Sequence, residues 1–286
     1  MVMNMRLKKC YRILLYTIII LAAVIAGVLL YKKYFGFSNQ INNDTLKPIY
    51  VNHMKEFDIK ESNYIEANYD RYISYKKNNP DYSDDEVITY VNIGLDHEFY
   101  SLMEETDMSD GYLIICNKYH KLKGDYVPDL ASLSGYGGGQ MEKEAAKYFK
   151  MMSDAAKKDG IKIYNVSGYR SYDTQKKLYN NYVLRDGKEK ADTYSARAGT
   201  SEHQTGLATD VNSISTSFDT TDAFKWLSKN AYKYGFILRY PKGKEYITGY
   251  MYEPWHYRYV GIDTAKIIYE KNITYEEYYA TYLLKK

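Results

Sequence analysis

Hydrophobic positions are spread unevenly along the chain, and the first part of the sequence differs from the rest. From Ile13 to Leu30 the residues form an apolar run with few polar interruptions. A helix rises ~1.5 Å per residue, so a helix of this length nearly crosses the ~30 Å hydrocarbon core of a bilayer. The pattern therefore predicts one transmembrane helix, a signal anchor over residues 13–31.

Basic residues flank this run on both sides, and more of them precede it than follow it: Arg6, Lys8, Lys9 and Arg12, then Lys32 and Lys33. The bias favours a cytoplasmic amino terminus. No small-residue cleavage site follows the run, so an uncleaved anchor is preferred and a cleaved signal peptide is the alternative. We expect a single-pass protein of the cell membrane, with a cytoplasmic tail over residues 1–12 and the rest of the chain extracellular.

The segment after the anchor changes from irregular to helical. Residues 32–59 are polar with little periodicity, which is typical of a stalk. Apolar residues then recur at helical spacing over 60–77. Ser83 followed by Glu86 is a capping box, which opens a second helix. Residues 60–110 are therefore predicted to form a small helical region.

The remaining sequence mixes helical and strand patterns without strict alternation, which favours an α+β fold over a doubly wound sheet. Helical patterns cover 141–158, 171–186 and the stretch from Asp222 to Gly235, and a Thr274–Glu277 capping box opens a terminal helix. Strand patterns cover 161–166, 207–211, 236–240 and 256–260. The glycine-rich stretch 134–139 is predicted to be a flexible surface loop.

Composition excludes one class of partner and adds little else. The 286 residues carry a formal net charge of +3, which gives no electrostatic footprint for nucleic acid, so no nucleic-acid partner is expected. The two cysteines, Cys10 and Cys116, would lie on opposite sides of the membrane, so we expect no disulfide between them. Cys116 stands in a short apolar run and is predicted to be a small buried hydrophobe.

Two short segments about fifty residues apart carry side chains of the kind that bind zinc. His203 and Asp210 stand in the first segment, and Glu253 and His256 in the second. Two histidines and one aspartate would leave a fourth position open on a zinc ion, and an unligated glutamate nearby can activate water. On one extended strand His203 and Asp210 would lie about 23 Å apart, so the chain must turn between them. Judged by spacing alone, an ordinary structural role explains each segment better than a metal site does.

A third segment, Ser167-Gly168-Tyr169-Arg170-Ser171, lies between a predicted strand and a predicted helix, a common place for functional loops. The planar guanidinium of Arg170 can hold a carboxylate, but it can equally pair with a local acid. Trp255, one of two tryptophans, can form the wall of a pocket. The residue pattern alone leaves these alternatives open.

Together the three segments resemble the VanY-type zinc D-alanyl-D-alanine carboxypeptidases, peptidase family M15B. The resemblance rests on Ser-Gly-Tyr-Arg-Ser, Ser-Glu-His-Gln-Thr-Gly-Leu-Ala-Thr-Asp and Glu-Pro-Trp-His, in this order, and extends from about Tyr112 to Lys271. It implies a hedgehog/DD-peptidase-like fold, with a small antiparallel sheet and flanking helices, preceded here by the transmembrane helix and the short helical region. The zinc carboxypeptidase domain would span 111–273, with the C-terminal helix over 274–286.

The resemblance also implies roles for single residues. His203, Asp210 and His256 would bind one Zn²⁺ ion, and Glu253 would be the catalytic base. Arg170 would bind the substrate or stabilise the oxyanion. The remaining implied contacts to substrate come from Gln175, Ser201 and Trp255.

The implied activity is removal of the C-terminal D-alanine from peptidoglycan stem peptides, by a domain that faces the cell wall. Two alternatives use the same scaffold, an L,D-carboxypeptidase and a peptidoglycan endopeptidase. A more distant alternative is a non-catalytic wall-binding module with a structural zinc. The free carboxylate of Glu253 favours catalysis, because structural zinc sites normally have four protein ligands.

Overall fold

A computed structural model describes residues 53–284, which belong to one structural unit, His53–Lys286. The predicted tail over 1–12, the predicted anchor over 13–31 and the stalk up to residue 52 lie outside the described residues. The domain boundaries proposed from the sequence remain predictions.

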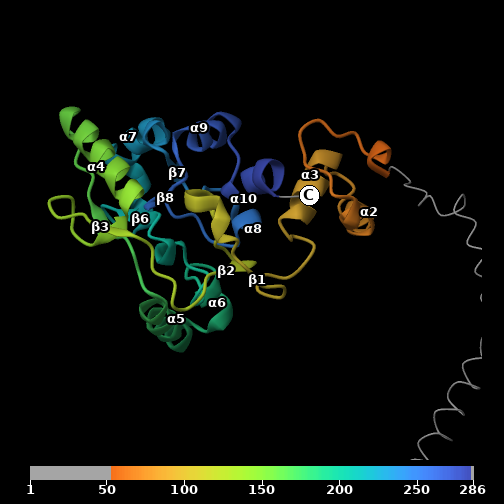
Figure 1. The fold of residues 1–286 in the computed structure, drawn as a ribbon, viewed down its shortest axis with the longest axis horizontal. Helices are drawn as coiled ribbons and strands as arrows, with labels where there is room; N and C mark the ends of the chain where they lie inside the picture. Colours follow the sequence, from red (N-terminus) through yellow and green to blue (C-terminus); the bar gives the residue numbers. More distant parts are fainter. Residues whose placement is uncertain (1–52, 285–286) are drawn as a thin grey trace, which may run out of the picture. The chain divides into compact units, whose positions relative to one another are not determined.

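A four-stranded antiparallel sheet carries the segments singled out in the sequence (Figure 1). Its strands, in spatial order, are β5 (Asn165–Ser167), β6 (Ala208–Val211), β8 (His256–Tyr259) and β7 (Phe236–Leu238). Two smaller sheets accompany it, an antiparallel pair and a parallel pair: β3 (Leu130–Ser132) with β4 (Gln140–Glu142), and β1 (Glu104–Glu105) with β2 (His120–Lys121).

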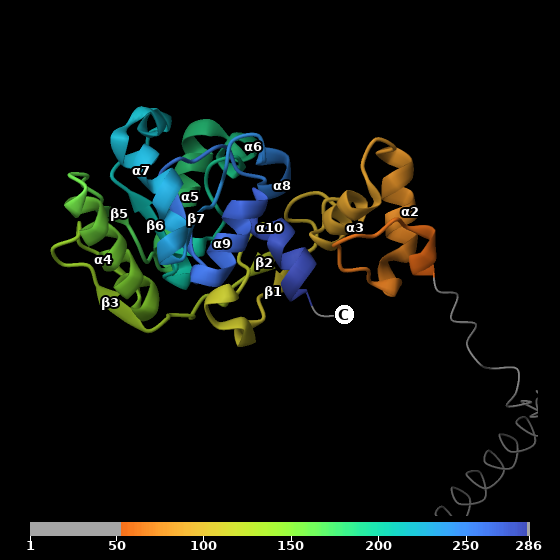
Figure 2. The ribbon, with the colours of Figure 1, turned by 90° about the horizontal axis from the view of Figure 1, so that it is seen from above.

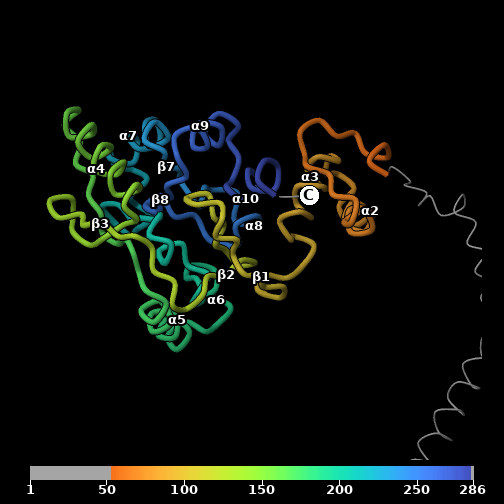
Figure 3. The backbone as a smooth tube through the Cα atoms, in the orientation of Figure 1, coloured from red at the N-terminus to blue at the C-terminus, as the bar shows by residue number. Residues whose placement is uncertain are grey.

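Helices make up most of the regular structure, and Figure 3 traces the chain through them. The α-helices are α2 (Tyr69–Asn78), α3 (Asp84–Asn92), α4 (Lys143–Lys158), α5 (Tyr172–Asp186), α6 (Lys188–Asp192), α7 (Asp222–Asn230), α8 (Glu245–Thr248), α9 (Ile262–Lys271) and α10 (Tyr275–Tyr278). Short 3₁₀ segments are η1 (His53–Glu56), η2 (Glu66–Asn68), η3 (Met108–Leu113), η4 (Glu202–Thr205), η5 (Thr216–Thr220) and η6 (Ala231–Tyr234), and the π-helical η7 (Tyr279–Leu283) follows α10.

Helix α4 covers one face of the central sheet (Figure 2). Its buried side chains recur at helical spacing, and Phe149 meets the ring of Phe236 on β7 edge-to-face at 6.2 Å. The side chain of Glu142 caps the helix by accepting hydrogen bonds from the amides of the first turn. Tyr257 and Tyr259 on β8 join this core.

Strand alternation places the chemistry on the opposite face of the sheet. Asp210 on β6 stands directly opposite His256 on β8, and Thr209 stands opposite Tyr257. Directly paired residues share a face, and successive residues alternate. Because Tyr257 points into the core under α4, Asp210 and His256 point away from it, together on the other face.

The range 60–110, predicted to be a small helical region, contains α2 and α3 but also strand β1, and its first helix is shorter than predicted. Helix α3 begins with the predicted capping box of Ser83 and Glu86. The pattern over 60–77 predicts a helix that in the structure begins only at Tyr69. The reason is that the Asp85 carboxylate accepts hydrogen bonds from three successive amides, those of Lys60, Glu61 and Ser62, which leaves that stretch outside the helix.

The fold class predicted from the sequence is wrong as stated. It describes one small antiparallel sheet behind a transmembrane helix, whereas residues 53–284 combine helices with three small sheets, one of them parallel. Within this described part, no helix is both long enough and apolar enough to cross a membrane. The parallel pair β1–β2 has two residues per strand, too few for any alternation to appear in the sequence.

The glycine-rich stretch 134–139 lies at the surface as a series of turns, as predicted, and part of it packs against the sheet. A Cβ atom on Gly137 would lie 2.1 Å from the backbone oxygen of Asn165, so this turn packs directly against β5. Asn165 donates a hydrogen bond from its side-chain amide to the carbonyl of Gly138 at 2.8 Å. Glycine is needed here for a close approach between backbones, because no side chain fits in that space.

Candidate active site

Three buried side chains with metal-binding atoms meet on the open face of the sheet. His203 in η4, Asp210 on β6 and His256 at the start of β8 each offer one atom, and these atoms all lie within 4.8 Å of one another. The turn required between His203 and Asp210 is made at Gly206, whose φ is +69°. A left-handed φ of this kind suits glycine, and it lets the chain fold back into β6.

The ring of His203 is held by a backbone contact. Its Nδ1 donates a hydrogen bond to the carbonyl oxygen of Gly168 at 2.8 Å. The other ring nitrogen, Nε2, therefore carries a lone pair and faces Asp210 Oδ2 at 3.5 Å. Two acceptors at this separation repel each other unless a cation or a proton lies between them.

This donor set fits zinc. Asp210 Oδ1 is buried and has no hydrogen-bond partner among residues 53–284, while His256 Nδ1 lies 3.3 Å from it. Two imidazole nitrogens and one carboxylate oxygen, with a fourth position open, form a typical zinc site of a hydrolytic enzyme. Burial opposes the charged form of Asp210, yet the adjacent His203 and His256 hold the pKa of its carboxyl well below the usual value.

Glu253 lies beside the three candidate ligands without joining them. Its Oε2 is 3.6 Å from His256 Nδ1, and its side chain is buried. Burial, reinforced by the charge of Asp210, raises the pKa of Glu253 to about 8, although His256 opposes the shift. A bound cation would favour the charged carboxylate, so this group is placed to take a proton.

Arg170 enters the same space from the loop before α5. Its Nη2 lies 3.8 Å from Asp210 Oδ2 and donates to Ser167 Oγ at 2.8 Å, while Nη1 donates to Gln175 Oε1 at 2.7 Å. Gln175 in turn donates to the carbonyl of Ala196. Burial lowers the pKa of Arg170 from its high ordinary value, but an arginine stays charged. The guanidinium is thus held in one orientation toward the site.

A cavity of about 590 Å³ joins these groups. Every residue that the sequence and the resemblance singled out lines it: Arg170, Gln175, Ser201, His203, Asp210, Glu253, Trp255 and His256. The other histidines of the chain, His53, His97 and His120, lie outside the lining. Cys116 is fully buried, which confirms its expected role as a core residue.

Further residues that the sequence did not identify as functional line the cavity. Tyr240 packs its ring 4.8 Å from the ring of His256, and Tyr250 and Met251 form part of the wall. Glu202, next to His203, also lines the site and is fully buried. Tyr240, Tyr250 and Met251 come from irregular segments and Glu202 from a short 3₁₀ turn, so only the position of Glu202 beside a candidate ligand could have pointed to one of them.

The fold and the site together define a hydrolytic enzyme of the peptidase class. A sequence model of the VanY family, described as D-alanyl-D-alanine carboxypeptidase, matches residues 138–262. The putative carboxypeptidase YodJ of Bacillus subtilis is 45% identical over 191 residues, covering 62% of this chain and 70% of the relative. This chain belongs to the VanY family of carboxypeptidases.

Two solved structures are similar in both sequence and fold. The LD-carboxypeptidase LdcB, whose structure concerns peptidoglycan recognition, is 44% identical with a TM-score of 0.58, over 63% of this chain and 90% of that one. A vancomycin resistance D,D-pentapeptidase VanY from a VanB-type resistance cassette, solved with Zn(II), is 37% identical with a TM-score of 0.53, over 58% of this chain and 98% of that one.

Proposed function

We propose that this protein is a zinc-dependent D,D-carboxypeptidase that removes the C-terminal D-alanine from peptidoglycan stem peptides. One observation carries the proposal: three buried metal-binding atoms within 4.8 Å of one another line a cavity that also contains a free glutamate and a positioned arginine. The family supports the reaction class, and the relative solved with Zn(II) supports the metal.

The site residues divide the work between metal binding and proton transfer. His203, Asp210 and His256 would hold the zinc ion, which when bound would polarise the scissile carbonyl and lower the pKa of a water molecule. Glu253 would accept the proton of that water and pass it to the leaving amine. This role requires Glu253 to stay unligated, and the group of side chains placed to share one ion is His203, Asp210 and His256, without Glu253.

Arg170 would bind the free carboxylate at the end of the stem peptide. A guanidinium presents a planar set of donors that matches a carboxylate, and Gln175 and Ser167 already hold it in position. Ser201 and Trp255 would complete the substrate site on the cavity wall. A terminal carboxylate next to the scissile bond is what separates a carboxypeptidase substrate from an internal peptide bond.

A second candidate is an L,D-carboxypeptidase, which removes D-alanine after an L-residue in the tetrapeptide stem. The observation that favours it is the higher identity to LdcB, 44%, than to the VanY D,D-pentapeptidase, 37%. Both activities would use the same metal site and the same terminal carboxylate. They differ only in the residue that precedes the scissile bond, which the cavity wall must accommodate.

Digestion of defined stem peptides tests the proposal. The zinc-loaded protein is incubated with pentapeptide and tetrapeptide stems, and the products are weighed by mass spectrometry. A D,D-carboxypeptidase removes one alanine from the pentapeptide and leaves the tetrapeptide intact. Loss of alanine only from the tetrapeptide would assign the L,D activity, and two intact peptides would refute both.

We also propose that the catalytic part acts outside the cytoplasm and faces the cell wall. The support is the substrate, since peptidoglycan lies on the outer side of the cytoplasmic membrane. Protease added to intact protoplasts should degrade the catalytic part. If it is degraded only after lysis, the proposed location is wrong.

A further inference from the structure

Glu202 is a buried acid to which the proposed reaction gives no role. It stands next to His203 in η4 and has no exposed side-chain surface. Its Oε1 accepts hydrogen bonds from Arg239 Nε at 2.8 Å and from Arg258 Nη1 at 3.2 Å. Its Oε2 has no hydrogen-bond partner among the described residues, although it is equally buried.

The free oxygen of Glu202 faces the back of a candidate metal ligand. His256 Nε2 lies 3.5 Å from Glu202 Oε2, and it too is buried and without a hydrogen-bond partner among residues 53–284. The other ring nitrogen, Nδ1, faces Asp210 at 3.3 Å and Glu253 at 3.6 Å. The imidazole therefore has a metal side at Nδ1 and a Glu202 side at Nε2.

We propose that Glu202 is a positioning residue for the metal site. Its carboxylate accepts the Nε2 proton of His256, which leaves the Nδ1 lone pair free for the metal and fixes the ring plane. The inference rests on the proposed function, because it assumes that His256 is a ligand. It goes beyond that function in naming the atom through which His256 binds and the group that orients it.

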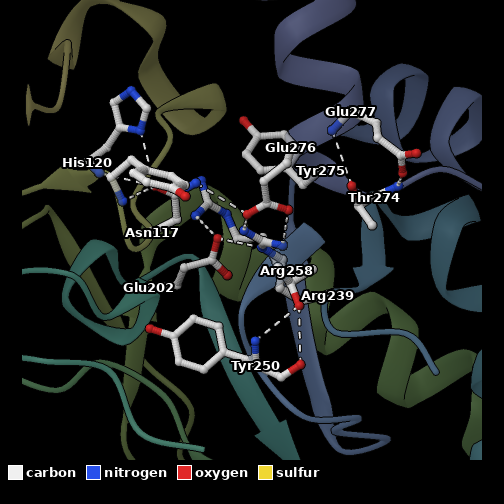
Figure 4. A network of polar contacts seen from close by, with 12 residues as sticks. Asn117, His120, Glu202, Arg239, Tyr250, Arg258, Thr274, Tyr275, Glu276 and Glu277 are labelled. Carbon is white, nitrogen blue, oxygen red and sulfur yellow. Dashed lines mark hydrogen bonds and ion pairs between the residues drawn. The ribbon is translucent and has the colours of Figure 1, made fainter. Parts of the chain in front are cut away.

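Two buried arginines, one of them also paired with Glu276, keep Glu202 in this orientation (Figure 4). Arg239 and Arg258 have no exposed side-chain surface, and Arg239 also donates to both oxygens of Glu276 on α10. Arg258 donates further to the backbone carbonyls of Tyr112 and Ile114 at 3.0 and 2.9 Å. The two arginines thus hold Oε1 from one side, and Oε2 can only point at His256.

Glu202→Gln tests this arrangement because it changes one atom. Arg239 and Arg258 only donate, so they would hold the amide oxygen in place of Oε1 and turn the NH₂ group toward His256. An amide donor there forces Nε2 to accept, which moves the ring proton to Nδ1 and blocks that nitrogen as a ligand. We expect the zinc dissociation constant, measured by competition with a chelating indicator, to rise by about 10- to 100-fold.

Glu276→Gln is the matched control. It removes one carboxylate from the same buried network, but Glu276 bonds Arg239 and Asn117 rather than a candidate metal ligand. It should lower the melting temperature of the metal-free protein as Glu202→Gln does, while leaving the zinc dissociation constant unchanged. Equal loss of zinc affinity in both variants would reduce Glu202 to a structural role and overturn the inference.

A readout on the unmodified protein covers the case in which the variants do not fold. Long-range ¹⁵N–¹H correlation spectra of histidine-labelled, zinc-loaded protein should show the His256 proton on Nε2 and the metal on Nδ1. Metal on Nε2 would overturn the inference. If the unmodified protein binds no zinc and cleaves no stem peptide, the proposed function is overturned as well. If the unmodified protein and Glu202→Gln bind zinc with the same dissociation constant, this inference alone is overturned.

Discussion

Removing Arg239 should destabilise the protein strongly, because it leaves buried carboxylates without their main partner. Arg239 has no exposed side-chain surface and bonds Glu202 at 2.8 Å and both oxygens of Glu276. In Arg239→Met, Glu202 keeps Arg258 at 3.2 Å, but among the described residues Glu276 keeps only the amide of Asn117 at 3.3 Å. Breaking a buried ion pair from one side costs about 3–5 kcal/mol, and here one carboxylate is left almost alone.

Urea unfolding of the metal-free protein measures this loss, with m-values compared between variants so that stability is separated from changes in exposed surface. Lys225→Met is the control, since its pair with Asp222 has the same kind of contact at 3.0 Å but lies in solvent, and it should cost less than about 1 kcal/mol. Arg239→Met/Glu276→Met removes the abandoned carboxylate and should recover part of the loss. The reasoning is refuted if Arg239→Met loses no more stability than Lys225→Met.

Three further outcomes follow from the site. Glu253→Gln should keep zinc, measured by metal analysis, and lose about 10²- to 10⁴-fold in kcat on the preferred stem peptide; full activity would exclude Glu253 as the base. Arg170→Lys keeps the charge but not the planar fork, so kcat/KM should fall about 100-fold at unchanged metal content, and an unchanged value would show that Arg170 does not orient substrate. The third outcome concerns stability in acid. Burial opposes the charged form of Glu202, but Arg239 and Arg258 outweigh burial and hold the pKa of its carboxyl below the ordinary 4.5. The charged carboxylate therefore stabilises the fold above pH 4.5, and this contribution is lost as the pH falls. The unfolding free energy of the metal-free protein should then fall more steeply below this pH than in Glu202→Gln, by up to about 1.4 kcal/mol per pH unit; parallel curves would contradict it.

Local signals in the sequence predicted local structure well. The capping boxes at Ser83–Glu86 and Thr274–Glu277 both form, because each depends on four consecutive residues and little else. The sequence offered both Ser171 and Asp173 as the cap of the next helix, and in the structure Ser171 caps it. The stretch before Tyr69 was predicted wrongly, since its backbone amides bond the Asp85 carboxylate, a contact that no helical periodicity reveals.

The candidate site could not be predicted from the spacing of its residues along the chain alone. His203 and Asp210 are brought together by a single left-handed glycine, and Asp210 meets His256 through strand pairing across a long separation in sequence. The family resemblance supplied this grouping in advance. It did not supply the surroundings of Glu202, whose partners Arg239 and Arg258 lie 37 and 56 residues further along the chain. Contacts of that kind are set by the tertiary fold alone.

The link between Arg239 and Glu276 has a consequence for the order of assembly during synthesis. The last of the candidate ligands is His256, but the second carboxylate that neutralises the two buried arginines is on α10. A nascent chain that has been made only through β8 therefore has every metal ligand and an excess of positive charge behind them. We expect Arg239 and Arg258 to stay in contact with water in such a chain, and to become buried only once Glu276 has left the ribosome.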